Sequence, residues 1–299
     1  MFSSTSVSVS LMFLLANSVL LVPSILIVIS VLGRPSMRTG ANLIVCQIAI
    51  LDILYALWAI VWHSVKLADP SVVTPSMCSL DGIISCLCML AWLYSATLCA
   101  YYRYHAVMYG EEILKARLQV LVGLQWVVPV FLTILIASTE GFSQMPSGGY
   151  CLLSYHNDSN TYFLFGMLIL FVLVPTYLSV YFYIVITRQC IRIANLAQIR
   201  NTQQAEYYQS FDKTQKMPTS LYSCHSIAFR AVMHSSTFVL TFLPLGFTMV
   251  YELIYKESRS ARLDAIVIGS VLVHKVLSPI VTLLINTSIL NRVKDLIRL

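Results

Sequence analysis

The stretch TLCAYYRYHAVMYG, residues 97–110, closes a long apolar segment with an arginine, Arg103, that stands among tyrosines. The stretch contains no acidic residue that could pair with this charge. An arginine can remain at the edge of an apolar region by extending its charged end toward water while its stem stays in apolar surroundings. The meaning of Arg103 therefore depends on the solvent around the chain, which the composition indicates.

The composition is that of a membrane protein. Of the 299 residues, 58% are hydrophobic and 11% are charged, whereas a soluble domain carries roughly 25% charged residues. Because lipid cannot satisfy bare backbone groups, apolar segments of about 20 residues must cross a bilayer as helices. The alternation of about ten residues that marks a strand barrel is not visible. The segments predict seven helices, at about 8–32, 42–65, 76–104, 118–138, 161–195, 222–254 and 263–285.

A shorter amphipathic segment follows the seventh helix. Ile289 and Val293 recur at helical spacing opposite Arg292, which predicts a helix at about 288–299 that lies on the inner leaflet. We therefore predict an all-α membrane protein, with a single seven-transmembrane helix bundle over residues 1–299 and a short amphipathic C-terminal helix. The leader of the first segment has no basic residue, so we interpret it as a helix; a removable signal that leaves six helices is the alternative.

The basic residues predict the orientation. One side of the membrane receives fourteen of the 19 lysines and arginines and the other side four, with Lys275 left inside a helix. Because cytoplasmic loops carry the excess of basic residues, we expect a multi-pass plasma-membrane protein with its N-terminus outside. The net charge of +6 then reflects topology and attraction to anionic lipid rather than nucleic-acid binding. Asn157 begins a glycosylation sequon in a loop on the outer side.

Two of the eight cysteines face the outer side in this topology. Cys78 lies at the outer end of the third helix, and Cys151 lies in the outer loop after the fourth helix. Disulfides persist in the oxidising environment outside the cell. The two cysteines are therefore natural disulfide partners, with two free thiols as the alternative.

The sequence around Arg103 resembles a receptor motif. Arg103 and Tyr104, followed by Ala106 and Val107, are similar to the Asp/Glu-Arg-Tyr motif of rhodopsin-like G-protein-coupled receptors. Other helices resemble the same family in order: Asn42, Ala49 and Asp52 in the second, Cys78 at the family spacing of 25 residues before Arg103, Trp126 in the fourth, Pro175 and Tyr183 in the fifth, FVLTFLP from Phe238 to Pro244 in the sixth, and SPIVT from Ser278 to Thr282 in the seventh.

The resemblance implies a receptor that senses an outside ligand and activates a heterotrimeric G protein when the sixth helix swings outward. Prolines fit such a role because each one frees backbone carbonyls and lets a helix bend. Tyr102 and Cys224 stand where the family has the acids that restrain the arginine, so we expect a weakly restrained receptor that signals without ligand. The residues implied for the switch are Arg103, Tyr104, Tyr183, Phe238, Phe242, Pro244 and Pro279.

Two opposite charges are predicted to meet inside the membrane. Asp52 and Lys275 each lie about ten residues, some 15 Å, from the cytoplasmic end of their helices. Charges inside a membrane are costly and tend to pair. We expect an ion pair in place of the sodium site that the resemblance implies, because Trp92 occupies the position of that site's hydroxyl on the third helix. The alternative is two unrelated charges that face separate water pockets.

The resemblance places the ligand pocket between the outer halves of the third, fifth, sixth and seventh helices. Ser85 stands where amine receptors have an acid, so the lining suits an apolar or lipid-like ligand. Apolar residues that face inward can also be plain packing, which is the alternative. The residues mapped to the pocket are Ser85, Met89, Met167, Phe171, Phe242, Leu245, Met249 and Ile268, with Trp58, Trp62 and His63 as a further wall.

Three other classes of function are less well supported. A retinal photoreceptor carries its lysine seven residues before the proline, whereas Lys275 lies four before Pro279 and Leu272 holds the opsin position. A small-solute transporter or channel needs more inward polar groups than Asp52, Lys275 and His274. We expect no enzyme, metal site or cofactor, because the HExxH and GxSxG motifs are absent and the six histidines are scattered.

Overall fold

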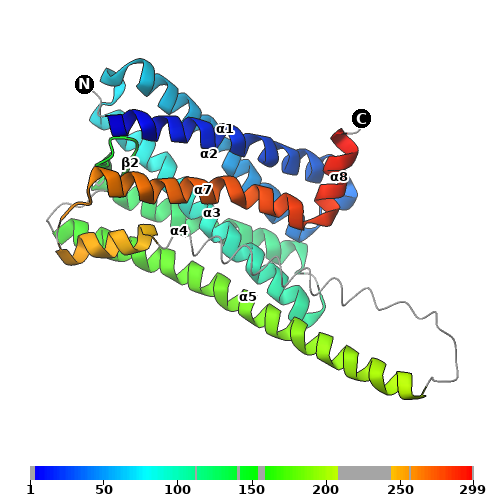
Figure 1. The fold of residues 1–299 in the computed structure, drawn as a ribbon. Helices are drawn as coiled ribbons and strands as arrows, with labels where there is room; N and C mark the ends of the chain where they lie inside the picture. Colours follow the sequence, from blue (N-terminus) through cyan, green and yellow to red (C-terminus); the bar gives the residue numbers. More distant parts are fainter. Residues whose placement is uncertain are drawn as a thin grey trace.

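In the part of the chain that the structure describes, six apolar segments form helices long enough to cross a membrane (Figure 1). The computed structural model describes residues 4–111, 113–139, 142–153, 159–207, 244–255 and 257–297. The long helices are α1 (Ser4–Leu32), α2 (Gly40–Ala68), α3 (Pro75–Tyr109), α4 (Lys115–Ser138), α5 (Ser159–Tyr207) and α7 (Ala261–Ile285). Short helical turns connect α1 to α2 (Pro35–Met37) and α2 to α3 (Pro70–Val72), and α8 (Thr287–Ile297) follows α7.

The predicted sixth helix, 222–254, is described only at residues 244–255, which are helical. Phe238, Phe242 and Cys224 lie outside the described residues, and so does the sequon residue Asn157. The predictions made for these four positions therefore stay predictions.

Three helix boundaries differ from the predictions by four residues or more. α1 begins at Ser4 rather than at residue 8, and α3 continues to Tyr109 rather than to residue 104. Gly110, at φ 72°, ends α3 in the left-handed conformation that favours glycine. α5 continues to Tyr207 rather than to residue 195, because residues 196–207 contain no Pro or Gly to interrupt a helix. This extension projects well beyond the neighbouring helices (Figure 1).

The two faces of α1 show that the bundle is built for lipid. Small polar residues such as Ser10, Asn17 and Ser24 are buried, whereas Leu15 and Val22 are 70% and 62% exposed. Small side chains allow helices to approach closely in a membrane, and exposed apolar side chains contact the lipid tails there. A soluble bundle would have the reverse arrangement. The chain is therefore a multi-pass membrane protein.

A two-stranded hairpin, which we did not predict, covers one end of the bundle. β1 (Phe142–Gln144) pairs antiparallel with β2 (Cys151–Leu153), with Phe142 opposite Leu153. The turn between the strands includes Gly148, which has φ 68° and thus needs the conformational freedom of glycine. Both strands lie against α3. We call this end of the bundle the hairpin end and the opposite end the α8 end.

At the α8 end, the last helix packs onto the bundle as an amphipathic helix. Ile289 and Val293 are 0% and 5% exposed, in a cluster with Val31 and Tyr102, whereas Lys294 faces outward. This arrangement confirms the predicted all-α fold with an amphipathic C-terminal helix, to which the structure adds the short hairpin.

Candidate functional site

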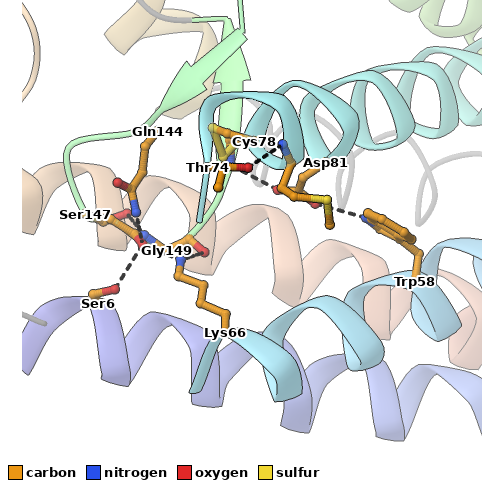
Figure 2. The surroundings of a disulfide bond; sticks show 12 residues. Ser6, Trp58, Lys66, Thr74, Cys78, Asp81, Gln144, Ser147 and Gly149 are labelled. Atoms are coloured by element: carbon orange, nitrogen blue, oxygen red, sulfur yellow. Dashed lines mark hydrogen bonds between the residues drawn. A yellow bond between two sulfur atoms is a disulfide. The ribbon is translucent and has the colours of Figure 1, made fainter. Parts of the chain in front are cut away.

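A disulfide joins the hairpin to the bundle. Cys78, in the first turn of α3, bonds to Cys151 of β2, with 5.4 Å between their Cα atoms (Figure 2). Thr74 caps this end of α3 by accepting a hydrogen bond from the backbone N–H of Met77. The disulfide confirms the predicted pairing and fixes the hairpin against the N-terminus of α3.

Removal of this disulfide is expected to destabilise the protein. The double variant Cys78→Ser with Cys151→Ser should lower the free energy of unfolding by about 2–4 kcal/mol, a typical value for a lost disulfide. Thermal unfolding of the purified protein measures the effect, and Cys88→Ser, at a free cysteine on the same helix, is the control. Recovery of both Cys78 and Cys151 as free thiols, by alkylation of the non-reduced protein, would contradict the pairing.

A buried carboxylate beside the disulfide holds strand β2. Asp81 is 3% exposed, and its Oδ2 accepts a hydrogen bond from the backbone N–H of Cys151 at 3.1 Å. Its Oδ1 accepts one from Nε1 of Trp58 on α2 at 3.0 Å (Figure 2). One side chain therefore connects α2, α3 and the hairpin, a connection that the sequence analysis missed.

A buried lysine holds the turn of the hairpin. Lys66, at the end of α2, donates hydrogen bonds to the carbonyl oxygens of Gly148 and Gly149, the latter at 2.7 Å. Ser6 of α1 and Gln144 of β1 also donate to the carbonyl of Gly148, at 2.9 and 3.0 Å (Figure 2). Lys66 is 1% exposed, although its sequence position suggested only a basic residue at the outer loop. Backbone carbonyls thus satisfy a cation that would otherwise be costly to bury.

A second buried network connects the hairpin to residues 244–255 and to α7. Arg259 Nε lies 2.7 Å from Oδ1 of Asp264, and Arg259 Nη1 lies 3.4 Å from Oε2 of Glu252. The phenol of Tyr150 donates to Asp264 at 2.6 Å and accepts from Arg259 at 3.2 Å. Burial, together with the charge of Asp264, raises the pKa of Tyr150 well above its usual range, so the phenol stays protonated and remains a donor. The sequence analysis did not find this network.

Below the hairpin lies a cavity between α1, α2, α3, α7 and residues 244–255. Four of the predicted pocket residues line it, namely Ser85, Met89, Leu245 and Ile268. The cavity is small, with a volume of about 50 Å³. Trp58 and His63 line it as predicted, whereas Trp62 does not, and the lining that was not predicted includes Phe13, Tyr55, Asp81, Tyr150, Leu152, Val271, Leu272 and Lys275.

Three residues of the predicted pocket, on the fifth and sixth helices, lie outside this cavity. Met167, Phe171 and Met249 pack into an apolar cluster with Leu132 and Leu168. α1 and α2 supply aromatic side chains instead. The cavity thus lies closer to α1 and α2 than the predicted pocket. Its lining includes the charged side chains of Asp81 and Lys275, which the predicted apolar lining did not include.

Lys275, which lines this cavity, lies beside Asp52. Lys275 Nζ is 3.6 Å from Oδ1 of Asp52, and the two side chains are 7% and 3% exposed. The ammonium also lies over two aromatic faces, 5.1 Å from the ring centre of Tyr55 and 5.5 Å from that of Trp92. His274 packs edge-on against Trp92 at 4.9 Å. Among the described residues, no group of His, Cys, Asp or Glu side chains could hold a metal ion.

A second cavity at the α8 end contains Arg103. Asp52, Trp92, Tyr183 and Pro279 also line it. Arg103 Nη1 donates a hydrogen bond to the hydroxyl of Tyr183 at 3.4 Å, and no carboxylate of a described residue lies within ion-pair distance of Arg103.

The aromatic neighbours of Arg103 point in different directions. Tyr102 is buried against Gly40 at the start of α2, where a larger residue would collide with the phenol ring. Tyr104 packs on the ring of Phe182 of α5 at 5.1 Å. Arg103 is thus held between α2, which takes up Tyr102, and α5, which contacts both Tyr104 and Arg103.

The helix-five proline is supported from α3. Pro175 cannot donate a backbone hydrogen bond to the carbonyl of Phe171, four residues earlier. The hydroxyl of Tyr94 donates to this carbonyl at 3.2 Å, and Thr97 donates to the carbonyl of Pro175 at 3.1 Å. A membrane offers no water to satisfy such groups, so α3 side chains stabilise the interrupted part of α5.

The bundle, the disulfide and the arginine at the α8 end together define a receptor of the seven-transmembrane class. A family described as 7 transmembrane receptor (rhodopsin family) matches residues 24–281, and the chain therefore belongs to the rhodopsin family of receptors. This is a family of receptors rather than of enzymes, as the sequence analysis expected. No curated protein matches the chain significantly.

Proposed function

We propose that the protein is a plasma-membrane receptor that binds a ligand below the hairpin and activates a heterotrimeric G protein at the α8 end. The hairpin end faces outside in this proposal, because most basic residues of the described part of the chain lie toward the α8 end. Glycosylation at Asn157 is part of the same proposal. The observation that supports it most is the hydrogen bond between Arg103 and Tyr183, which both line the cavity at the α8 end.

The contact between Arg103 and Tyr183 supports a switch without an acidic lock. In the proposed mechanism, Tyr183 holds the arginine in the position that engages the G protein, and no carboxylate of the described residues opposes this. A half-exposed ion pair contributes about 1 kcal/mol, which is several-fold in population, so its loss raises ligand-free signalling. Phe238, Phe242 and Pro244 of the predicted sixth helix, with Tyr104 and Pro279, complete the proposed switch.

The cavity below the hairpin supports a small ligand with a largely apolar body. Phe13, Tyr55 and Trp58 supply aromatic surface, as expected of a site for such a ligand. His63 and Lys275 add polar groups, which differs from the purely apolar or lipid-like ligand expected from the sequence. A transporter or a channel is not proposed, because family membership favours a receptor. A retinal photoreceptor is not proposed, because Lys275 lies four rather than seven residues before Pro279 and pairs with Asp52.

Replacement of Arg103 is expected to abolish G-protein activation. Arg103→Ala removes the cation at the α8 end and should reduce ligand-free activation in cells to background at equal surface expression. Tyr183→Phe removes only the hydroxyl, and a lost hydrogen bond of about 1 kcal/mol should reduce activation several-fold. Arg34→Ala, which removes an exposed arginine at the same end, is the control. Normal signalling by Arg103→Ala would show that the arginine serves only as a membrane-surface anchor.

A further inference from the structure

The ion pair of Asp52 and Lys275 lies at the boundary between the two cavities. Lys275 lines the cavity below the hairpin, and Asp52 lines the cavity that contains Arg103 and Tyr183. The pair is therefore the point at which a ligand on one side can affect charges on the other side. A group that competes with Asp52 for Lys275 has to come from the cavity below the hairpin, because Lys275 lines that cavity.

The ammonium of Lys275 has hydrogen-bonding capacity that the described residues use only in part. It carries three N–H donors, and its nearest carboxylate oxygen, on Asp52, is 3.6 Å away, which is longer than a hydrogen bond. Its other close neighbours are the ring faces of Tyr55 and Trp92, which accept no conventional hydrogen bond. A buried cation with spare donors on a cavity wall favours an anionic oxygen.

Asp81, the acid that lines the cavity below the hairpin, does not oppose an anion at Lys275. Asp81 lies eleven residues before Trp92 on α3, which corresponds to about 16 Å along the helix axis. Both of its oxygens already accept hydrogen bonds, from Trp58 and from the backbone of Cys151. Between Asp81 and Lys275 the cavity wall includes Ser85 and Met89 together with aliphatic residues of α7 and 244–255. The site therefore combines a cationic floor with mostly apolar walls.

We infer that Lys275 binds the carboxylate of a small, mostly apolar ligand, and that this contact weakens the ion pair with Asp52. The inference deepens the proposed receptor function and rests on it, because it names the ligand class of the same cavity. A bound carboxylate replaces Asp52 as the anion that pairs with Lys275. Asp52, which lines the cavity that contains Arg103, is then left without its cationic partner. The volume of about 50 Å³ limits such a ligand to a short chain or a single ring unless side chains move.

Carboxylates and their neutral amides of the same size test this inference. We would measure the thermal stability of the purified receptor with butyrate, butyramide, phenylacetate and phenylacetamide. At least one acid is expected to stabilise the wild type in a saturable manner, at least tenfold more tightly than its amide. Asp52→Asn frees Lys275 from its competitor and should bind the same acid several-fold more tightly. The double variant Asp52→Asn with Lys275→Met has no stranded charge and should lose the preference for the acid.

Lys294→Met, at an exposed lysine on α8, controls for general effects of a lost positive charge. The inference is overturned if neither acid stabilises the wild type or Asp52→Asn, if acid and amide act equally, or if the double variant keeps the preference. G-protein activation is measured separately in cells. Acid binding without any G-protein activation would reject the proposed signalling function and leave the anion site intact, so the two failures can be told apart.

Discussion

Lys275→Met alone is expected to lower the free energy of unfolding by about 3–5 kcal/mol, because it leaves the buried carboxylate of Asp52 without a countercharge. Asp52 is 3% exposed, and the ammonium of Lys275 is the one cationic group of the described residues within ion-pair distance. Asp52→Asn should have a smaller cost, because the remaining ammonium still lies over the rings of Tyr55 and Trp92.

Neutralisation of both charges should restore much of the lost stability. The double variant Asp52→Asn with Lys275→Met buries no unpaired charge, so its loss should be clearly smaller than the sum of the two single losses. Thermal unfolding of the four proteins, purified in the same detergent, gives the coupling between the residues. Additive losses would mean that the two charges do not stabilise one another. A specific effect of sodium, measured against choline, would instead place an ion beside Asp52.

Arg259→Met is expected to lower the free energy of unfolding by a similar amount, about 3–5 kcal/mol, because it strands two buried carboxylates at the hairpin end. Arg259 lies 2.7 Å from Asp264 and 3.4 Å from Glu252, and its side chain is 1% exposed. The loss should also remove one of the two hydrogen bonds of Tyr150 and so weaken the hold of this network on the hairpin.

Arg262→Met provides the matched control for this network, because Arg262 is an exposed arginine three residues further along the chain. It should leave the unfolding temperature nearly unchanged. Glu252→Gln should have a milder effect than Arg259→Met, because it leaves the shorter contact between Arg259 and Asp264 in place. Equal unfolding temperatures for Arg259→Met and Arg262→Met would refute the stabilising role of the network.

Several features of this receptor follow from properties that can be counted along the chain. An apolar segment that is long enough to cross the bilayer is predicted to be a helix, because lipid cannot satisfy the backbone groups of any other single-segment structure. The direction of the chain then places Cys78 and Cys151 at the same end of the bundle, which left one natural pairing. Asp52 and Lys275 could be matched in the same way, since a predicted depth in the membrane restricts which charges can meet, and they lie 3.6 Å apart.

The length of α5 shows where such counting stops. Its apolar part suggested an end near residue 195, yet the helix continues to Tyr207. Outside the lipid, a helix can continue until Pro or Gly interrupts it, and residues 196–207 contain neither. The apolar segment therefore predicts the part of the helix that crosses the membrane and not the full length of the helix.

The ligand cavity and the hairpin depended on how the helices rotate and pack. Met167 and Phe171 lie on the expected helix but face an apolar cluster, whereas Phe13 and Tyr55 turn toward the cavity. Lys66 and Arg259 read as surface charges in the sequence, yet both are buried, Lys66 against carbonyls of the hairpin turn and Arg259 against Asp264 and the hydroxyl of Tyr150. Spacing along the chain places a residue at a depth in the membrane. Spacing does not show which way a side chain faces across the bundle. It also does not show which groups from other segments will satisfy a buried charge, because only the packing of the helices and the hairpin brings these groups together.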